Sequence, residues 1–469
     1  MLSKSTNTLN LITYGFEPCY VEKYLDPIVD KDIFNVTHVF IGEGENYEDY
    51  CANNNTYHLT NTKDVNNYSV DYSLLSELEQ VSNRSINSVI ESDRCLMYKD
   101  YSYSLSYVSF IATNFIKLNN QYKPNIVMGN FDNAFSLIVN MCCKYLGIKW
   151  ISPFFYPLPS SRVGYCSDLS PDTLIPYSRE DDLSKLYSEA EKNYSNFINK
   201  RLRSHGYEIL INRYKVFKNI FSLCTGLRKR LKKEVYYNPY VWPTIDERFS
   251  DIIKRFKNRI ITPKRNLVSR YPESPYIYFP LHMSPESCLD TWASTYKDQV
   301  ALIAQVIHQI PIDYKLIIKP HFMDPYTWTR ANIRKITSYP NVYFTSHLLD
   351  SYKLIKNASL ILTVQGSSAL EASLLGKPSI TFGKSPYNIF SSCACMKNIN
   401  TLREEINSMI NNNSISKEKI IMEYSQFLSN SSEVYESSFD WERPLTSNET
   451  NLMRDQLVSV VEFCLSEEL

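Results

Sequence analysis

The chain has 469 residues, of which 43% are hydrophobic and 21% charged, a composition typical of a globular protein large enough for two domains. Lysine plus arginine and aspartate plus glutamate each number 50, so the formal net charge is zero and gives no overall attraction to nucleic acid. The eleven cysteines lack the even spacing of a disulfide framework and the paired spacing of a metal site, which favours buried free thiols in a reducing compartment.

The first part of the chain alternates apolar runs with helical segments. Strands are expected at residues 9–14, 35–41, 124–128 and 148–151, and an apolar helix at residues 134–146. Such alternation is typical of a parallel sheet covered by helices. We therefore predict an N-terminal α/β domain over residues 1–170.

The pattern changes to several helices with few strong strands over residues 171–272. This segment is basic, and leucines recur at helical spacing beside its densest cluster of charges. That cluster consists of Arg228, Lys229, Arg230, Lys232 and Lys233. Its composition predicts peripheral contact with anionic lipid at a membrane surface. The alternatives are a solvated basic helix or a helix lining a cleft for an anionic substrate.

A second α/β domain is expected over residues 273–390. Its strands are expected at residues 276–281, 314–318, 341–344 and 359–364, with a helix at 297–309. Polar helices are expected to occupy residues 391–469. The chain contains no run of about 18 apolar residues and its first residues lack the apolar core of a signal peptide, so we expect a cytoplasmic protein.

The tract from residue 359 to residue 383 reads as a buried strand, a small polar turn and a helix that Gly376 ends. The turn contains Gln365, Ser367 and Ser368, whose hydroxyl and N–H groups at a helix start suit an anion such as a phosphate. Glu371 falls in the first helical turn, where it suits a sugar hydroxyl. The alternative is an ordinary strand–helix unit with a serine as its N-cap.

Two further polar clusters follow other strands of the same predicted domain. Lys319 and His321 follow one strand, and His282 and Glu286 follow the first strand. Since ligands of open α/β sheets bind at the carboxyl ends of the strands, we expect all three clusters to converge. Lys319 and His321 suit a phosphate, whereas His282 and Glu286 would face a sugar. For each histidine taken alone, a structural role is the alternative.

The order of these tracts resembles the capsular polysaccharide biosynthesis family, which includes Kdo transferases. The resemblance rests on LHxxPE at residues 281–286, KPH at 319–321 and GSSALEASLLGKPSITFG at 366–383. It implies that His321, Ser367 and Ser368 hold the phosphate of a CMP-activated sugar. Phe322 stands where the family has a proline, which keeps UDP-sugar and CDP-polyol donors as alternatives.

The N-terminal domain is expected to bind the acceptor and to contribute a catalytic carboxylate. The candidates are Glu91, Asp93 and Asp132, and among them we favour Asp93. A carboxylate there could act as a base toward the acceptor hydroxyl or as a nucleophile in a double displacement. A plain salt bridge between Asp93 and Arg94 is an equal alternative.

These observations predict a GT-B-like α/β fold, with two doubly wound Rossmann-type domains facing a cleft and a helical insert between them. The resemblance implies a glycosyltransferase of capsule or O-antigen assembly that moves Kdo or a related nonulosonate from a CMP donor to a glycan or glycolipid acceptor. We expect no cofactor and no metal, because the only literal Asp-x-Asp match at residues 30–32 precedes a strand. The alternatives are a sugar-nucleotide epimerase and a scaffold that binds glycan or lipid without catalysis.

Overall fold

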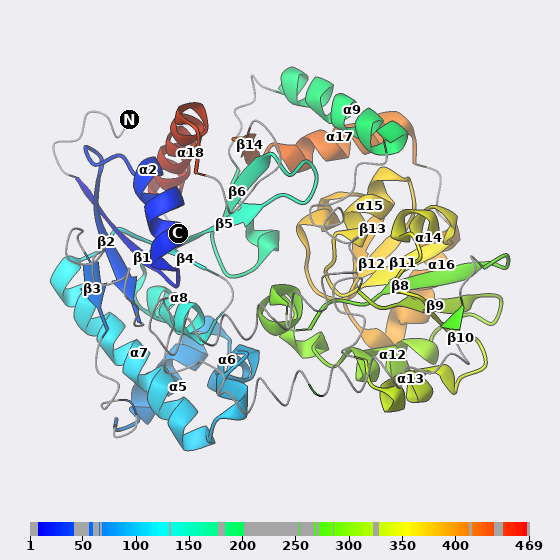
Figure 1. Cartoon of the computed structure of the whole chain (residues 1–469), viewed down its shortest axis with the longest axis horizontal. Helices are drawn as coiled ribbons and strands as arrows, with labels where there is room; N and C mark the ends of the chain where they lie inside the picture. The colour runs from blue at the N-terminus through cyan, green and yellow to red at the C-terminus, as the bar shows by residue number, and fades with distance from the viewer. Residues whose placement is uncertain are drawn as a thin grey trace.

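Two α/β domains lie side by side, and each is built on a seven-stranded sheet (Figure 1). The computed structural model describes residues 8–41, 56–59, 65, 68–130, 133–176, 183–200, 253, 267–268, 272–284, 286–321, 328–411, 415–435 and 444–466. Asp132, Phe322 and the basic cluster from Arg228 to Lys233 lie outside these residues. The predicted membrane contact of that cluster therefore stays a prediction.

The first sheet has the strand order β14–β6–β5–β4–β1–β2–β3. Its strands are β1 (Leu9–Tyr14), β2 (Phe34–Phe40), β3 (Thr56–His58), β4 (Ile126–Gly129), β5 (Lys149–Phe155), β6 (Arg162–Cys166) and β14 (Ser431–Glu433). The pairs from β3 through β1 to β5 are parallel, whereas β6 runs antiparallel to both β5 and β14. The chain leaves β1 in one direction and returns to β4 on its other side, which makes the sheet doubly wound.

Helices cover both faces of the first sheet. They are α1 (Pro18–Tyr20), α2 (Asp26–Ile28), α5 (Tyr72–Ser82), α6 (Ile86–Ser92), α7 (Tyr101–Tyr122) and α8 (Ala134–Leu146). The next helix, α9 (Leu183–Lys200), packs against the core between the two domains. Helix α8 is apolar on most sides and packs into one core with α5, α6 and α7. Asn133 caps its start, and Gly147, with φ +70°, ends it.

The second sheet has the order β13–β12–β11–β8–β9–β10–β7, and every pairing in it is parallel. Its strands are β7 (Leu267–Val268), β8 (Tyr276–Pro280), β9 (Lys315–Lys319), β10 (Val342–Thr345), β11 (Leu360–Thr363), β12 (Ser379–Thr381) and β13 (Cys393–Cys395). Continuous apolar runs suit its central strands because helices bury both faces. From β8 the chain moves outward through β9 and β10, and then returns to β11 on the opposite side.

The helices around the second sheet are α12 (Gln299–Ile307), α13 (Arg330–Thr337), α14 (Ser351–Asn357), α15 (Ser368–Leu374), α16 (Leu402–Asn411) and α17 (Lys417–Leu428). Apolar residues of α12, α13 and α16 pack on one face of the sheet and form a core with it. The other face packs against α14 and α15. This second face includes the end of β9, where Lys319 lies.

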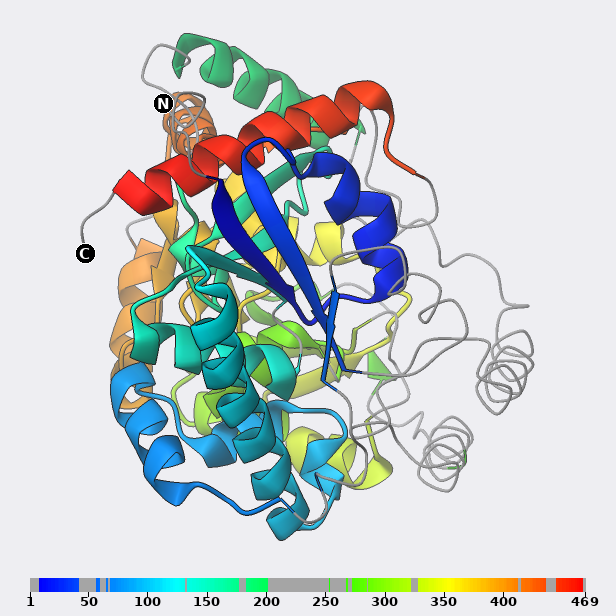
Figure 2. The ribbon, with the colours of Figure 1, turned by 90° about the vertical axis from the view of Figure 1, so that its left-hand side faces the viewer.

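The last part of the chain returns to the first domain. Strand β14 pairs with β6, and α18 (Ser447–Ser466) lies across β1 and β2, where Leu457 and Val461 enter the core (Figure 2). The sequence predicted only helices after residue 390, and this was wrong for β13 and β14. Each of these strands has three residues and no long apolar run, so the edges of the existing sheets determine their structure.

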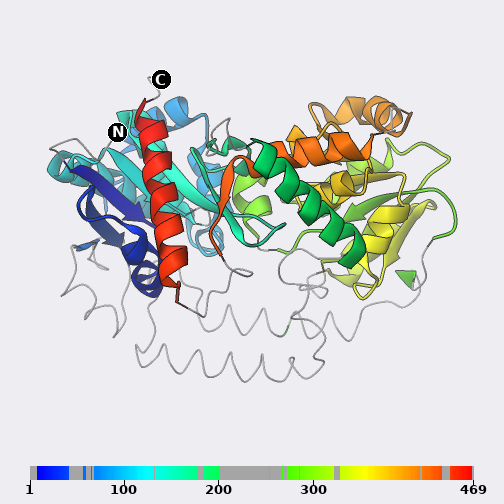
Figure 3. The same cartoon turned by 90° about the horizontal axis from the view of Figure 1, so that it is seen from above.

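The two domains share an apolar core. It joins Phe154 and Tyr156 of the first domain to Leu370, Phe390 and other residues of the second. Helices α9 and α17 lie side by side over this core (Figure 3). Large hydrophobic interfaces of this kind restrict the motion of one domain relative to the other.

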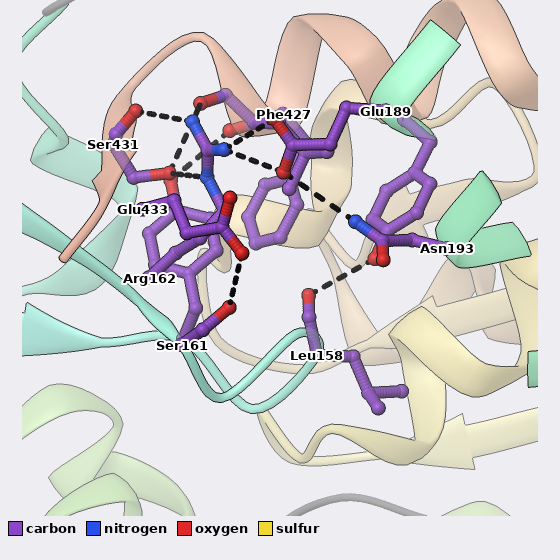
Figure 4. Close-up of polar contacts among 11 residues, drawn as sticks. Leu158, Ser161, Arg162, Glu189, Asn193, Phe427, Ser431 and Glu433 are labelled. Atoms are coloured by element: carbon purple, nitrogen blue, oxygen red, sulfur yellow. Dashed lines mark hydrogen bonds and ion pairs between the residues drawn. The ribbon is translucent and has the colours of Figure 1, made fainter. Parts of the chain in front are cut away.

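A buried arginine reinforces the same junction (Figure 4). Arg162 Nη1 contacts both carboxylate oxygens of Glu189 at 2.6 and 2.7 Å, and Nε donates to Ser431 Oγ at 2.9 Å. Nη2 donates to the carbonyls of Leu428 and Ser431 at 3.0 and 2.6 Å. The guanidinium therefore fixes the returning chain between α17 and β14 to the first domain.

None of the described helices combines the length and the hydrophobicity needed to span a bilayer.

Candidate functional site

The candidate site lies where the winding of the second sheet reverses. Strand β8 stands between β9 and β11, and ligands of doubly wound sheets bind outside such a switch point. His282 follows β8 and Thr363 ends β11, and His282 Nε2 lies 3.2 Å from Thr363 Oγ1. Gly366 leaves little room for a side chain, because an added Cβ would lie 3.0 Å from both the His282 ring and Thr363 Oγ1. The three clusters predicted from the sequence thus follow three neighbouring strands.

The hydrogen bonds of His282 define the protonation of its ring. The Gln365 backbone N–H donates to Nε2 over 3.4 Å, so Nε2 is an acceptor and the neutral ring carries its proton on Nδ1. Nδ1 lies 3.2 Å from Glu286 Oε2 and therefore donates to this carboxylate. The His282 side chain is only 7% exposed, whereas that of Glu286 is 33% exposed. His282 is thus a buried support, and Glu286 is the member of the pair that a substrate can reach.

The charge of Glu286 follows from these neighbours. Burial alone raises the pKa of its carboxyl group, but the hydrogen bond from His282, the electrostatic interactions with His282 and His321 and a hydrogen bond with Cys288 outweigh burial, so the pKa is below its usual value. Glu286 is therefore ionised at neutral pH. An ionised carboxylate suits a base, a nucleophile or a stabiliser of positive charge, and does not suit a general acid.

Cys288 completes the surroundings of this pair. Its Sγ lies 3.1 Å from His282 Nδ1, and burial raises the pKa of its thiol well above the usual value. The ligand atoms of His282, Glu286 and Cys288 lie within 4.8 Å of one another, and zinc accepts such a ligand set. A metal would have to displace the Nδ1 proton that the Gln365 contact enforces. Hydrogen bonds already account for this geometry.

Lys319 provides a buried positive charge at the end of β9. It interacts electrostatically with Asp350, the N-cap of α14, and with Glu371 in the first turn of α15. Burial lowers the pKa of its ammonium group to about 8, while the nearby carboxylates of Asp350 and Glu371 act in the opposite direction. His347, which follows β10, lies near enough for the charge of Lys319 to add to the effect of burial and lower its pKa. Lys319 therefore stays mostly protonated at pH 7.

Sequence reasoning missed His347 and Asp350. Both follow β10, just as His321 follows β9. The rule that ligands bind at strand ends, applied to that strand as well, would have found them.

The small-residue turn carries polar side chains that make few hydrogen bonds with the described part of the protein. Ser367 occupies the N-cap position of α15, but its side chain makes no capping hydrogen bond, so the N-cap alternative does not describe it. Ser368 is half-buried at the first helical position. Gln365 is buried, and its side-chain N–H donates to the Lys384 carbonyl, while Oε1 has no hydrogen-bond partner among the described residues. Helix α15 has only seven residues. Binding of an anion at this turn would therefore depend more on the hydroxyl groups of Ser367 and Ser368 than on the helix dipole.

Asp93 lies in the first domain, at the C-terminal end of α6, and its carboxylate contacts the start of α8. Its Oδ1 accepts hydrogen bonds from the backbone N–H groups of Cys95 and Leu96, and its Oδ2 accepts one from Ala134 at 3.0 Å. The alternative of a salt bridge between Asp93 and Arg94 does not describe the structure, in which Arg94 Nε contacts Asp290 Oδ2 at 3.3 Å. The hydrogen bond of Glu91 with the second domain is made by its backbone carbonyl, not by its carboxylate. This carbonyl accepts from Lys297 Nζ at 2.5 Å.

Comparisons with known proteins give one family match and several similar structures. Residues 274–391 match the family model of capsule polysaccharide biosynthesis proteins. The structure is similar to the β-Kdo 2,4 transferase KpsC of Thermosulfurimonas dismutans, with 10% identity and a TM-score of 0.33 over 64% of this chain and 79% of that one. It is also similar to UDP-GlcNAc 2-epimerase of Methanocaldococcus jannaschii, with 13% identity and a TM-score of 0.30 over 96% and 99%.

No curated protein sequence matches the chain. Structural scores this low do not separate one activity from another. The family match spans the part of the second domain that contains His282, Lys319 and Glu371. The second domain thus has the sequence pattern of the capsule polysaccharide biosynthesis proteins, within a chain whose two doubly wound domains follow the GT-B plan.

Proposed function

We propose that the protein is a glycosyltransferase of capsule or other surface polysaccharide assembly. The observation that carries the proposal is an ionised, accessible Glu286, supported by buried His282, at the switch point of a domain that matches the capsule family. The proposed donor is a CMP-activated acidic sugar, Kdo or a related nonulosonate, and the proposed acceptor is a glycan or glycolipid. UDP-sugar and CDP-polyol donors are the nearest alternatives.

In this proposal the donor phosphate binds opposite Glu286. Lys319 and His321 supply positive charge, and Ser367 and Ser368 supply hydroxyl donors. Glu371 would accept from a hydroxyl of the ribose. All these groups belong to residues 319–371, from the end of β9 to the first turn of α15, which follows β11.

The reaction would proceed by attack of an acceptor hydroxyl on the anomeric carbon. The bond from this carbon to the phosphate oxygen breaks, and its electron pair leaves with the phosphate, which Lys319 and His321 stabilise. Glu286 takes the proton of the attacking hydroxyl as the new glycosidic bond forms. His282 positions Glu286 through its Nδ1–H. We assign to Asp93 a role in holding the start of α8, since its carboxylate already accepts three backbone hydrogen bonds.

The first test is a thermal-shift panel with CMP, CDP, UDP and GDP and their sugar conjugates. Selective stabilisation by CMP and its acidic-sugar conjugates is expected. Stabilisation by UDP or CDP alone would keep the fold and replace the proposed donor. No response to any nucleotide would contradict the transferase, and turnover of a nucleotide sugar without acceptor would identify an epimerase.

Nucleotide affinity is expected to decrease as the pH rises, because Lys319 loses its proton. The ammonium charge is present below its pKa of about 8 and is lost as the pH rises through that value. CMP keeps a dianionic phosphate throughout this range, because its second pKa is about 6. Calorimetry should show CMP binding about tenfold weaker at pH 9 than at pH 7. Lys319→Met should bind CMP weakly at both pH values, and an equal pH dependence in this variant would exclude Lys319 as the titrating group.

A further inference from the structure

A buried carboxylate links the two domains close to the candidate site. Asp290 has a side chain only 3% exposed, and it contacts Arg94 Nε of the first domain and Lys297 Nζ of its own domain, each at 3.3 Å. Lys297 Nζ also donates to the Glu91 carbonyl of the first domain. Arg84 Nη2 adds a contact to the Thr291 carbonyl at 3.5 Å. Asp290 is therefore the centre of a polar junction between the domains.

The segment that carries Asp290 is the segment that carries Glu286. The backbone N–H groups of Leu289 and Asp290 both donate to the Glu286 carbonyl, at 3.0 and 2.9 Å. A π-helical turn follows at Cys288–Trp292, and such turns recur at functional sites. One side of this turn places Cys288 against His282. The other side places Asp290 against Arg94.

The two junctions between the domains differ in character. The apolar core under α9 and α17 is buried, and Arg162 reinforces it with a full set of hydrogen bonds. The junction at Asp290 is ionic, and Arg94 remains 40% exposed. A buried carboxylate is costly unless its charge is paired, so Asp290 favours the arrangement in which Arg94 reaches it. Contact between the domains at this point therefore acts directly on the turn after Glu286.

We infer that Asp290 is a positioning residue, which uses Arg94 and Lys297 to fix the Glu286 carboxylate when the two domains meet. This inference rests on the proposed function for the role of Glu286, but the geometry stands without it. A purely structural ion pair would stabilise the fold without affecting the order of the segment around Glu286. A positioning pair controls that order specifically.

Arg94→Gln is the appropriate variant because it removes the charge at a half-exposed position and should fold. Hydrogen exchange of peptides covering residues 286–292 should become about tenfold faster, because the amides that hold Glu286 open more often. Arg94→Lys keeps the charge and should restore most of the protection. Lys144→Gln is the matched control, since it removes an ion pair with Asp168 that lies wholly in the first domain.

Transfer activity with the donor found by the nucleotide panel gives the second measurement. Arg94→Gln should lower the turnover rate about tenfold while CMP affinity changes less than twofold. Unchanged exchange at residues 286–292 in Arg94→Gln would overturn the inference. The exchange measurement needs no substrate, so it remains decisive even if the proposed transferase activity is not found.

Discussion

Glu286→Gln should greatly slow sugar transfer while CMP still binds. The substitution keeps the size of the side chain and its place beside His282, but removes the charge that the lowered pKa maintains at neutral pH. A positioned base contributes about 10²–10⁴-fold to a rate, so a loss of this size is expected. Single-turnover transfer assays would measure the rate, and calorimetry with CMP would measure binding.

His282 and Asp93 provide the comparisons for this variant. His282→Asn should lose part of the activity, and the double variant with Glu286→Gln should lose no more than Glu286→Gln alone, because both act through one carboxylate. Asp93→Asn should chiefly lower stability, since it weakens the start of α8. A folded Asp93→Asn protein without activity, beside an active Glu286→Gln protein, would place the catalytic carboxylate in the first domain.

Much of the fold could be predicted because local signals agree with the final structure. Strand β1 and helix α8 have the predicted bounds, 9–14 and 134–146. An apolar run defines the strand, and a capping asparagine and a terminal glycine define the helix. The remaining predicted strands differ from the structure by a few residues at their ends. Strand ends also indicated the site, since the carboxyl ends of parallel strands must share one edge.

The rest depends on contacts between distant parts of the chain. Strand β14 exists only because the edge of β6 is available to it, and its sequence, SSE, contains no strand pattern. Arg94 contacts Asp290 across the two domains, and a sequence shows no such pairing. The different roles of His282 and Glu286 likewise follow from the Gln365 backbone N–H, whose place depends on how β8 and β11 pair.

Arg162→Met should lower the free energy of unfolding by about 3–5 kcal/mol, the scale of breaking a buried ion pair. The substitution removes the buried guanidinium that donates to the carbonyls of Leu428 and Ser431 and pairs with the carboxylate of Glu189 (Figure 4). Glu189 then keeps only the weaker contact from Asn193 Nδ2 at 3.4 Å among the described residues. Urea denaturation followed by circular dichroism would measure the loss. Arg162→Lys keeps the charge but not the planar guanidinium. Its free energy of unfolding should therefore lie between those of the unsubstituted protein and Arg162→Met.

Lys144→Met is the matched control for this prediction, because it removes an ion pair at an exposed position. Lys144 and Asp168 are 2.6 Å apart, as close as Arg162 and Glu189, but both side chains are about one-third exposed. An exposed pair contributes about 0–1 kcal/mol, because water replaces the lost partner. Equal losses in the two variants would mean that Arg162 does not fix the returning chain. A large loss only in Arg162→Met would show that burial, rather than the length of the contact, determines how strongly β14 and α17 are held to the first domain.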